Sequence, residues 1–496
     1  SLAPIPISLP LTPAQAFLAW PRQVPVLALW SGSGADTPDH PIAPEARWTI
    51  LGIPSDWRVL PHGVAATDIK AFLRGLAPYA DAAAATSAAP SETPAPNAAS
   101  AASALVPGWF LRVSYEVGEA LEPATTRDGP AAASTIAAPE HWPLAEAARV
   151  DQALIYDHAQ KQWYAVGHAR RLVALVTDAP AVAHNFDLGP LTSQWGQDGY
   201  ERAVRSAIDL IHAGDCYQVN LAHAMTAPFA GSARALFAAM CARAMPWHGA
   251  YMERDDADGT RRALLSISPE LFLSFDHATR TLATRPMKGT RRAGTGDSSA
   301  QQDLESSVKD HAELAMIIDM MRNDLGRSAE LGSVRVDSPR RIEHHGNGTG
   351  AVLQATGQVS ATLRDGVELA HAIADAFPPA SVTGAPKIRA MQIIRALEPT
   401  RRDAYCGCVG MRSDHGDLAL NVAIRTAMIH GRIAGTPGAS KPRDTAPRDT
   451  APRDAFAHAT LTYHVGAGIV ADSAPDQEWR ETLDKAGQLA AIAGAN

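Results

Sequence analysis

The stretch TRPMKGTRR places one lysine, Lys288, between an apolar residue and a Gly-Thr pair. A lysine at such a loop tip can act as a nucleophile when its surroundings keep the amine neutral. Five other residues of the nonamer are Thr or Arg, so a solvated surface charge is the ordinary alternative for a lone lysine. The choice between these two interpretations depends on what the rest of the chain supplies.

Two segments that predict helices each carry a pair of carboxylates three residues apart. Segment 308–327 contains Asp310 and Glu313, and the last segment of the chain contains Glu478 and Glu481. Residues three apart share one face of a helix, and each pair alone is most simply a solvated face. If the pairs meet, they repel unless a cation lies among them, and Mg²⁺ with oxygen ligands and several waters suits such a site.

Glycines at two further positions could let the backbone approach a small ligand. Gly384 comes just before a predicted helix, whose free N–H groups attract anions. Gly466 and Gly468 flank one alanine in VGAGIVADS, and glycine permits close backbone contact there. An ordinary capped turn explains the first position equally well, and a lone GxG pattern is weak support for the second.

Composition excludes several classes of protein. The chain has 496 residues, is 46% hydrophobic and carries a net charge of −8, so it has no general attraction to nucleic acid or acidic membranes. Its four cysteines are too few for a disulfide scaffold and fit a cytoplasmic protein. The first residues lack the basic region of a signal peptide, and no run of about 18 apolar residues predicts a membrane span.

The order of predicted elements favours an α+β architecture, because strands and helices mix without regular βαβ alternation. Segment 81–104 is rich in Ala, Pro, Ser and Thr, and segment 434–455 contains a repeat of Pro-Arg-Asp-Thr-Ala. We expect both to be flexible surface inserts. The second insert separates two strand-like runs, so it is expected to be an enlarged hairpin loop. Helices are predicted over 199–215, 308–327 and 385–397 and near the C-terminus, and strands over CYQVNLAHAM and LLSISPELFLSFD.

Eight runs of the sequence, in order from residue 214 to 486, resemble the family of chorismate-utilising enzymes. They are GDCYQVNLA, SISPELFL, TRPMKGTRR, DHAELAMIIDMMRNDLGR, FPPASVTGAPKIRAMQII, YCGCVGM, LALNVAIRTA and GAGIVADSAPDQEWRETLDKA. The resemblance covers more than half of the chain and is weaker before residue 192, where LRVSYEVGE (111–119) carries it. It divides the chain into an N-terminal segment, 1–192, that contributes to the sheets, and a chorismate-binding catalytic domain, 193–496.

This resemblance implies a fold and a site. The fold is two large β-sheets packed face to face, with helices outside and the active site between the sheets. In the site, Glu270 assists loss of the ring hydroxyl of chorismate as general acid or base. The residues that match the family's Mg²⁺ carboxylates are Glu313 and Glu481, with Glu478 and Asp310 beside them. Those that match its substrate contacts are Tyr405, Arg425, Thr290, Gly384, Ala385, Gly466 and Gly468.

Two positions indicate which reaction the resemblance implies. Members that aminate chorismate at C4, toward 4-aminobenzoate and folate, typically read PIKGT, whereas members that aminate at C2, toward tryptophan, typically read PIAGT. This chain reads PMKGT, so Lys288 is expected to attack C2 while the C4 hydroxyl leaves. Gln218 stands where members that add water carry a lysine, and an amide cannot act as that base. Amination at C4 is therefore expected, and amination at C2 is the alternative.

The family resemblance also implies a separate glutaminase subunit that delivers ammonia from glutamine, because no glutaminase motif occurs in the chain. A non-catalytic chorismate- or tryptophan-binding protein is a further alternative, but the candidate catalytic residues are all retained. The chain departs from the family pattern at Gln354 and Gln358, near the place of a usual histidine. It also departs at Asp403, where glycine is usual, and at Ala222, where serine is usual.

Overall fold

The computed structural model describes residues 4–21, 23–32, 47–76, 105–126, 142–178, 185–292, 298–345, 352–434 and 455–493. Within these ranges, 21 strands form one continuous sheet built from antiparallel ladders. Eleven α-helices alternate with the strands irregularly in this described part of the chain. The predicted α+β architecture is confirmed.

The sheet has two arms that meet at strand β5 (Ala145–Asp157), which pairs with β3 (Trp48–Leu60) on one side and β4 (Gly108–Val113) on the other. The first arm, called here the β9 arm, continues from β3 through β2 (Leu27–Trp30), β10 (His248–Asp255), β11 (Thr260–Ser268), β20 (Thr426–Ile433) and β21 (Phe456–Ile469) to β9 (Gln218–Gly231). Three short strands, β7 (Phe186–Leu188), β8 (Thr192–Ser193) and β17 (Gly384–Ala385), also pair with β9.

The second arm, called here the β16 arm, leads from β4 to β16 and its two partners. Its strands are β18 (Cys408–Ser413), β19 (Leu418–Val422), β12 (Leu271–Asp276), β13 (Thr281–Arg285) and β16 (Val352–Thr362), with β14 (Met287–Arg292) and β15 (Arg335–His345) paired to β16. Strands β6 (Gln162–Val166) and β1 (Ile5–Ile7) extend the sheet beyond β5.

Strands of both arms bury their two faces in different cores, as the period of two in a strand requires. In β11, Leu265 lies in a core beneath helices, whereas the preceding Leu264 lies in a core shared by the two arms. In β18, Cys408 lies beneath helices and Val409 lies in the shared core. The shared core takes residues from β2, β3, β10, β11 and β20 of one arm and from β4, β5 and β18 around the other. The two arms therefore pack face to face, as predicted, although strand pairing through β5 joins them into one sheet.

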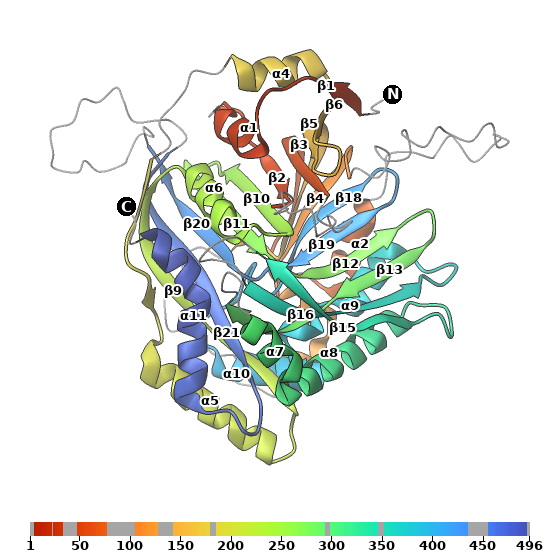
Figure 1. Cartoon of the computed structure of the whole chain (residues 1–496), viewed down its shortest axis with the longest axis vertical. Coiled ribbons are helices and arrows are strands. Elements are labelled where there is room, and N and C mark those ends of the chain that lie inside the picture. The colour runs from red at the N-terminus through yellow and green to blue at the C-terminus, as the bar shows by residue number, and fades with distance from the viewer. Residues whose placement is uncertain are drawn as a thin grey trace.

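Helices cover the outer faces of both arms (Figure 1). Those over the β9 arm are α1 (Pro13–Ala19), α4 (Ala169–Thr177), α6 (Ala233–Ala244) and α11 (Pro475–Ala493). Those over the β16 arm include α2 (Ala66–Gly75), α8 (Val308–Gly326) and α9 (Leu369–Ala376), while α5 (Gly196–His212) and α10 (Lys387–Leu397) pack against β9. The smaller helices are α3 (Val117–Leu121) and α7 (Ser298–Ser306).

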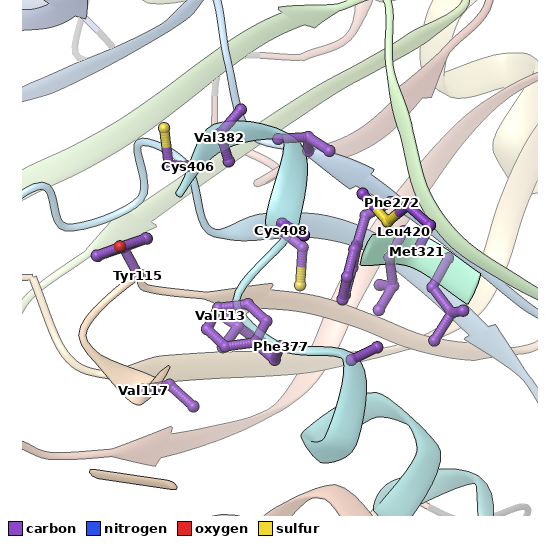
Figure 2. Packing of buried hydrophobic residues seen from close by; sticks show 14 of the residues in the cluster. Val113, Tyr115, Val117, Phe272, Met321, Phe377, Val382, Cys406, Cys408 and Leu420 are labelled. Carbon is purple, nitrogen blue, oxygen red and sulfur yellow. The ribbon is translucent and has the colours of Figure 1, made fainter. Parts of the chain in front are cut away.

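The core beneath α8 and α9 brings distant parts of the chain together (Figure 2). In it, Phe272 of β12 packs edge-on against Phe377, with ring centroids 5.9 Å apart, and Met321 of α8 lies nearby. The four cysteines are buried and unpaired, and two of them, Cys406 and Cys408, belong to this core. The prediction that the cysteines form no disulfide scaffold is confirmed.

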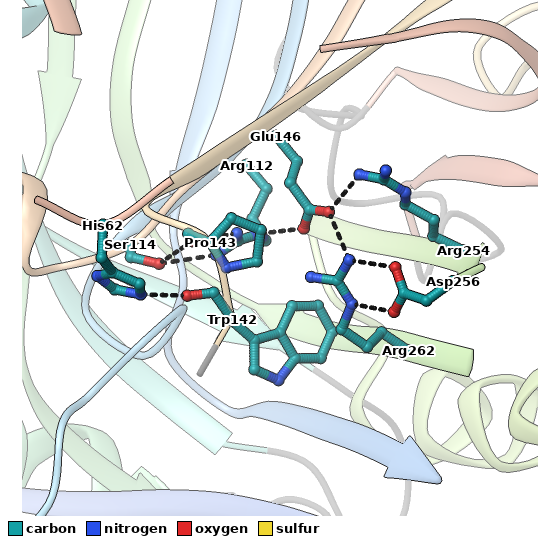
Figure 3. Close-up of polar contacts among 9 residues, drawn as sticks. All are labelled: His62, Arg112, Ser114, Trp142, Pro143, Glu146, Arg254, Asp256 and Arg262. Carbon is teal, nitrogen blue, oxygen red and sulfur yellow. Dashed lines mark hydrogen bonds and ion pairs between the residues drawn. The ribbon is translucent and has the colours of Figure 1, made fainter. Parts of the chain in front are cut away.

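A buried ionic network links the arms on the side of β5 (Figure 3). Glu146 of β5 accepts a hydrogen bond of 3.1 Å from Arg112 of β4 and one of 3.0 Å from Arg254 of β10. Arg262 of β11 lies 3.3 Å from the same carboxylate and also pairs with Asp256. Since β4 and β5 adjoin the β16 arm and β10 and β11 belong to the β9 arm, one glutamate connects both.

The helices predicted over 308–327 and at the C-terminus are confirmed as α8 and α11. The helix predicted over 199–215 is present as α5, which begins three residues earlier, at Gly196, and ends at His212. The helix predicted over 385–397 begins two residues later, at Lys387, because Gly384 and Ala385 pair with β9 and Pro386 is the N-cap residue. The strand pair around Pro269 is confirmed as β11 and β12.

Insert 81–104 lies outside the described residues, as does 434–455 apart from its two end residues. Those two residues, Ala434 and Ala455, are joined by a backbone hydrogen bond of 2.8 Å, and β20 and β21 pair on either side of them. The hairpin position of the second insert is therefore confirmed. None of the helices in the described ranges combines the length and apolar character needed to span a bilayer.

Candidate active site

Lys288 lies on β14 and faces a carboxylate of helix α8. Its Nζ is 2.6 Å from Oε2 of Glu313, and the two side chains are 24% and 9% exposed. Strand β14 carries a register shift between Met287 and Thr290 against β16, and Gly289 between them has a φ of +92°, a value that favours glycine. A Cβ at Gly289 would also lie 2.9 Å from the Asp310 carboxyl group. The Gly of the PMKGT motif thus permits the bend that presents Lys288 to α8.

Strands β9 and β21 complete the surroundings of the Lys288 amine. A Cβ placed on Gly468 would lie 3.1 Å from Lys288 Nζ and 2.8 Å from Gln218 Nε2, so this glycine allows both side chains to approach the backbone. Gln218 in turn pairs with Ala385 of β17, and Gly384 pairs with Val219. Gly384 has a φ of +137°, and a Cβ there would lie 2.3 Å from the carbonyl oxygen of Gln218. A larger residue at Gly384 would therefore collide with the backbone of β9, and one at Gly468 would displace the ends of the Gln218 and Lys288 side chains.

The carboxylates of α8 and α11 surround the same amine. Burial lowers the pKa of Lys288, but the negative charges of Glu313, Glu481 and Glu478 act in the opposite direction, and the pKa is raised overall. Burial raises the pKa of Glu478, and the charge of Glu481 acts in the same direction. In this structure Lys288 is therefore held as a cation, whereas the sequence suggested that burial could keep it neutral.

The residues predicted to hold Mg²⁺ fit a hard cation in ligand type, although they are not gathered into a finished site. No group of three or more His, Cys, Asp or Glu residues in the described ranges is arranged to hold a metal ion. Oε2 of Glu313 is nevertheless buried and accepts no hydrogen bond of good geometry, and its contact is the Lys288 amine. A buried carboxylate oxygen in this state suits a cation. The Asp310 carboxylate accepts a hydrogen bond of 3.0 Å from Arg291 instead.

Glu270 lies in the tight connection between β11 and β12 and is 2% exposed. Its Oε1 accepts a hydrogen bond of 2.5 Å from the Ser381 hydroxyl. Burial raises the pKa of Glu270 to about 7, against the opposing effects of Ser381, Arg425 and Lys288. A carboxyl group with such a pKa is partly protonated at neutral pH, which is the state that a general acid needs.

Arg425 and Tyr405 are the residues predicted to hold a carboxylate of the substrate, and Arg425 is close enough to Glu270 for their charges to interact. Burial lowers the pKa of Arg425, while Tyr463 and Glu270 oppose the shift, and within the described ranges its guanidinium makes no hydrogen bond or ion pair. Arg425 has a φ of +49°, a strained value for a non-glycine residue that is often found at functional sites. The Tyr405 hydroxyl is 3.0 Å from where a Cβ on Gly466 would lie. A half-buried guanidinium that has no partner among the described residues is suited to binding a carboxylate.

The structure accounts for two departures from the family pattern. Asp403 has a φ of +51°, in the left-handed region where glycine is favoured and where Asp is among the better tolerated residues. Gln354 lies on β16 directly opposite Thr290 of β14, and its Nε2 is 3.4 Å from the Thr290 hydroxyl oxygen. Thr290 therefore contacts Gln354 and lies two residues along β14 from Lys288.

Sequence reasoning missed two residues of this region, Lys485 and Ser381. Lys485 Nζ donates to the carbonyl oxygen of Gly466 at 2.7 Å and lies 2.7 Å from Oε1 of Glu481, so it connects a proposed metal carboxylate to a proposed substrate contact. The sequence could have indicated Lys485, because it follows Glu481 by four residues, a spacing that brings two side chains together on one face of a helix. No comparable spacing indicates Ser381, which reaches Glu270 from the turn before β17.

Comparison with known proteins identifies the family. Residues 63–440 match the model of the chorismate binding enzymes, and the chain therefore belongs to this family. Among solved structures, anthranilate synthase component I from Streptococcus pneumoniae TIGR4 superposes with a TM-score of 0.66 and 22% identity, covering 92% of this chain and 95% of that chain. The menaquinone-specific isochorismate synthase from Escherichia coli superposes with a TM-score of 0.65 and 17% identity, covering 99% and 93%. These likenesses establish the fold.

Curated relatives divide between two activities. Aminodeoxychorismate synthase component 1 of Klebsiella aerogenes is 36% identical over 326 residues, which cover 64% of this chain and 63% of that protein. Anthranilate synthase component 1 3 of Haloarcula marismortui is also 36% identical, over 300 residues that cover 60% of this chain and 52% of that protein. The alignments thus span less than two thirds of the length of these relatives, and identity does not separate the two activities.

Proposed function

We propose that this chain is the synthase component of aminodeoxychorismate synthase, which converts chorismate and ammonia to 4-amino-4-deoxychorismate for the synthesis of 4-aminobenzoate and folate. The observation that carries this proposal is the amine of Lys288, which lies against Gly468, Gln218 and Glu313 in the middle of the predicted site. The relatives named aminodeoxychorismate synthase component 1 support it.

The proposed reaction begins when the neutral Lys288 amine attacks C2 of chorismate. The ring double bond shifts and the C4 hydroxyl leaves as water, with its proton supplied by Glu270. Ammonia then adds at C4, the double bond shifts back, and the bond between C2 and the Lys288 nitrogen breaks. The amine leaves with its electron pair, and the proton lost by ammonia returns Glu270 to its acid form. The steps balance as chorismate plus ammonia giving the 4-amino product plus water.

Other residues of the site would bind the substrate and a metal. Arg425 and Tyr405 would hold a carboxylate of chorismate, and the backbone at Gly384, Ala385, Gly466 and Gly468 would approach the ring, with Thr290 and Gln218 beside it. Mg²⁺ would be held by Glu313, Glu478 and Glu481. When bound, it would offset two of the negative charges that these carboxylates and a carboxylate of the substrate bring to the site. Without the metal, Glu313 holds Lys288 as a cation.

The ammonia would come from glutamine through a separate glutaminase subunit. The relatives named aminodeoxychorismate synthase and those named anthranilate synthase are both called component 1. These names support a second component that supplies nitrogen. The corresponding experiment adds ammonium salt in place of this subunit, so that the synthase chemistry is tested alone.

The second candidate function is that of anthranilate synthase component 1, which the equally similar relatives favour. Incubation of the purified chain with chorismate, Mg²⁺ and ammonium, followed by separation and mass analysis of the products, distinguishes the two. We expect 4-amino-4-deoxychorismate from the wild-type protein and little or none from Lys288→Ala. Anthranilate as the main product of the wild-type protein would refute the proposed function.

A further inference from the structure

Helix α11 carries Glu478 and Glu481, so its rotation about its own axis decides where these carboxylates point. Each of them is followed directly by a residue that is fixed to β9, namely Trp479 and Thr482. Successive residues of an α-helix lie about 100° apart around the axis. Any rotation allowed at the fixed residues would therefore be passed on to the carboxylates.

The group that fixes α11 is His223 of β9, a residue that the proposed reaction does not use. Its ring is 1% exposed and stacks on Trp479 with centroids 5.0 Å apart and planes 26° apart. Nδ1 of His223 is 3.0 Å from the Ser193 hydroxyl, and Nε2 is 3.0 Å from the Thr482 hydroxyl. Tyr200 packs against both rings, with centroids 5.0 Å from His223 and 5.9 Å from Trp479.

The hydrogen bonds at both ends determine which nitrogen of His223 carries the proton. The Ser193 oxygen already accepts N–H groups from Trp195 at 3.2 Å and Gly196 at 3.0 Å, so its own proton is directed to His223 Nδ1. The Thr482 hydroxyl donates at 2.7 Å to the carbonyl oxygen of Trp479, so its oxygen accepts from His223 Nε2. The network therefore assigns a neutral imidazole with its proton on Nε2.

We propose that Ser193, His223 and Thr482 form a directional hydrogen-bond chain that positions the carboxylates of α11 for Mg²⁺. This hydrogen-bond chain runs from Ser193 of β8, which accepts the N–H of the first residue of α5, through His223 of β9 to the backbone of α11 between Glu478 and Glu481. His223 is a positioning residue in this arrangement, since it acts through the helix. The inference rests on the proposed Mg²⁺ site and adds the residues that hold that site in shape.

The test is Mg²⁺ binding measured by titration calorimetry with MgCl₂ alone, well below the unfolding temperature. Thr482→Val keeps the shape of the side chain but removes the hydroxyl, and we expect it to weaken Mg²⁺ binding by about 10-fold or more, as loss of outer-shell partners does. Thr482→Ser keeps the hydroxyl and should bind Mg²⁺ as the wild type does. The product assay described above serves only as a second readout.

The chain offers a matched control in Thr49, which is buried on β3 with its hydroxyl 2.8 Å from Nε2 of His158. Thr49→Val breaks the same kind of Thr–His contact in a different part of the sheet. We expect it to lower thermal stability while leaving Mg²⁺ affinity unchanged. If Thr49→Val weakens binding as much as Thr482→Val, or if Thr482→Val binds as tightly as the wild type, the positioning role is refuted.

A second measurement reads the protonation of His223 directly in the wild-type protein. In wild-type protein labelled with ¹⁵N-histidine, the His223 signals at pH 7 should show the proton on Nε2, with His223→Gln used only to assign them. A proton on Nδ1, or a doubly protonated ring, would refute the proposed direction of the hydrogen bonds from Ser193 through His223 to Thr482. A wild-type protein that binds no Mg²⁺ would refute the metal site itself and the positioning with it, whereas the outcome with Thr482→Val tests positioning alone.

Discussion

Replacing Glu270 by glutamine should stabilise the folded protein at high pH and at the same time abolish its activity. Burial holds the pKa of Glu270 at about 7, compared with 4.5 for an unperturbed glutamate. The folded state therefore binds this proton more tightly than the unfolded state, and the associated stability is complete below pH 4.5 and lost as the pH rises through 7. Each pH unit between the two pKa values is worth about 1.4 kcal/mol, so the loss is about 3 kcal/mol by pH 8.

Glutamine removes this dependence because it stays uncharged and its oxygen can still accept the hydrogen bond of Ser381. We expect the difference in unfolding free energy between Glu270→Gln and the wild type to shift in favour of the variant by roughly 2 to 3 kcal/mol between pH 5 and pH 8. The assay is urea unfolding of both proteins at pH 5, 6, 7 and 8. Wild-type turnover should decline as the pH rises above 7, and Glu270→Gln should be inactive throughout.

Two results would refute this reasoning. Stability curves that stay parallel from pH 5 to pH 8 would show that Glu270 is ionised in the folded protein at no cost. A Glu270→Gln variant that retains the wild-type rate would show that Glu270 does not deliver the proton. Control measurements on Ser381→Ala should show a higher pKa for Glu270, because the Ser381 hydroxyl favours the ionised form.

Three further predictions concern the nucleophile, the second insert and the buried network. Wild-type protein given chorismate without amine should form an adduct on Lys288, detected by intact mass, while Lys288→Ala and Lys288→Arg form none; an adduct on either variant contradicts covalent catalysis by Lys288. Deletion of 436–453 should change the unfolding temperature little, because loop closure costs grow slowly with length, and a failure to fold would contradict this. Glu146→Gln should destabilise the protein by about 3–5 kcal/mol in urea unfolding, because it leaves the buried Arg112 guanidinium without its negatively charged partner, and a loss below about 1 kcal/mol would contradict it.

The sequence predicted most of the elements that carry the site because their signals are local. Helix α8 follows from an apolar stripe at helical spacing, and the break at Pro269 follows from the geometry of proline. The connection of the two arms through β5 could not be predicted, because it depends on pairing between strands about 100 residues apart in the chain, such as β3 and β5. Local patterns carry no information on such partners.

In the candidate site, too, some features could be predicted from the sequence and others could not. The identity of the reactive groups came from motifs, and the structure brings Lys288, Glu313, Gln218 and Gly468 together. The charge state of Lys288 could not be read from the sequence, because it depends on how burial and three carboxylates balance in space. Likewise, His223 lies in an apolar strand and has no motif, and only the folded structure reveals its position between Ser193 and Thr482.

The departure at Gln354 has a consequence for the proposed reaction. Its side chain lies opposite Thr290 and can hold a hydrogen bond there, but an amide cannot transfer a proton at neutral pH. Arg425 remains charged, and Lys288 must give up its proton to act as the nucleophile. Among the described residues of the site, Glu270 is then the group whose pKa lies where proton transfer to the departing hydroxyl is efficient. The pH dependence of Glu270 therefore tests the mechanism as well as the stability of the fold.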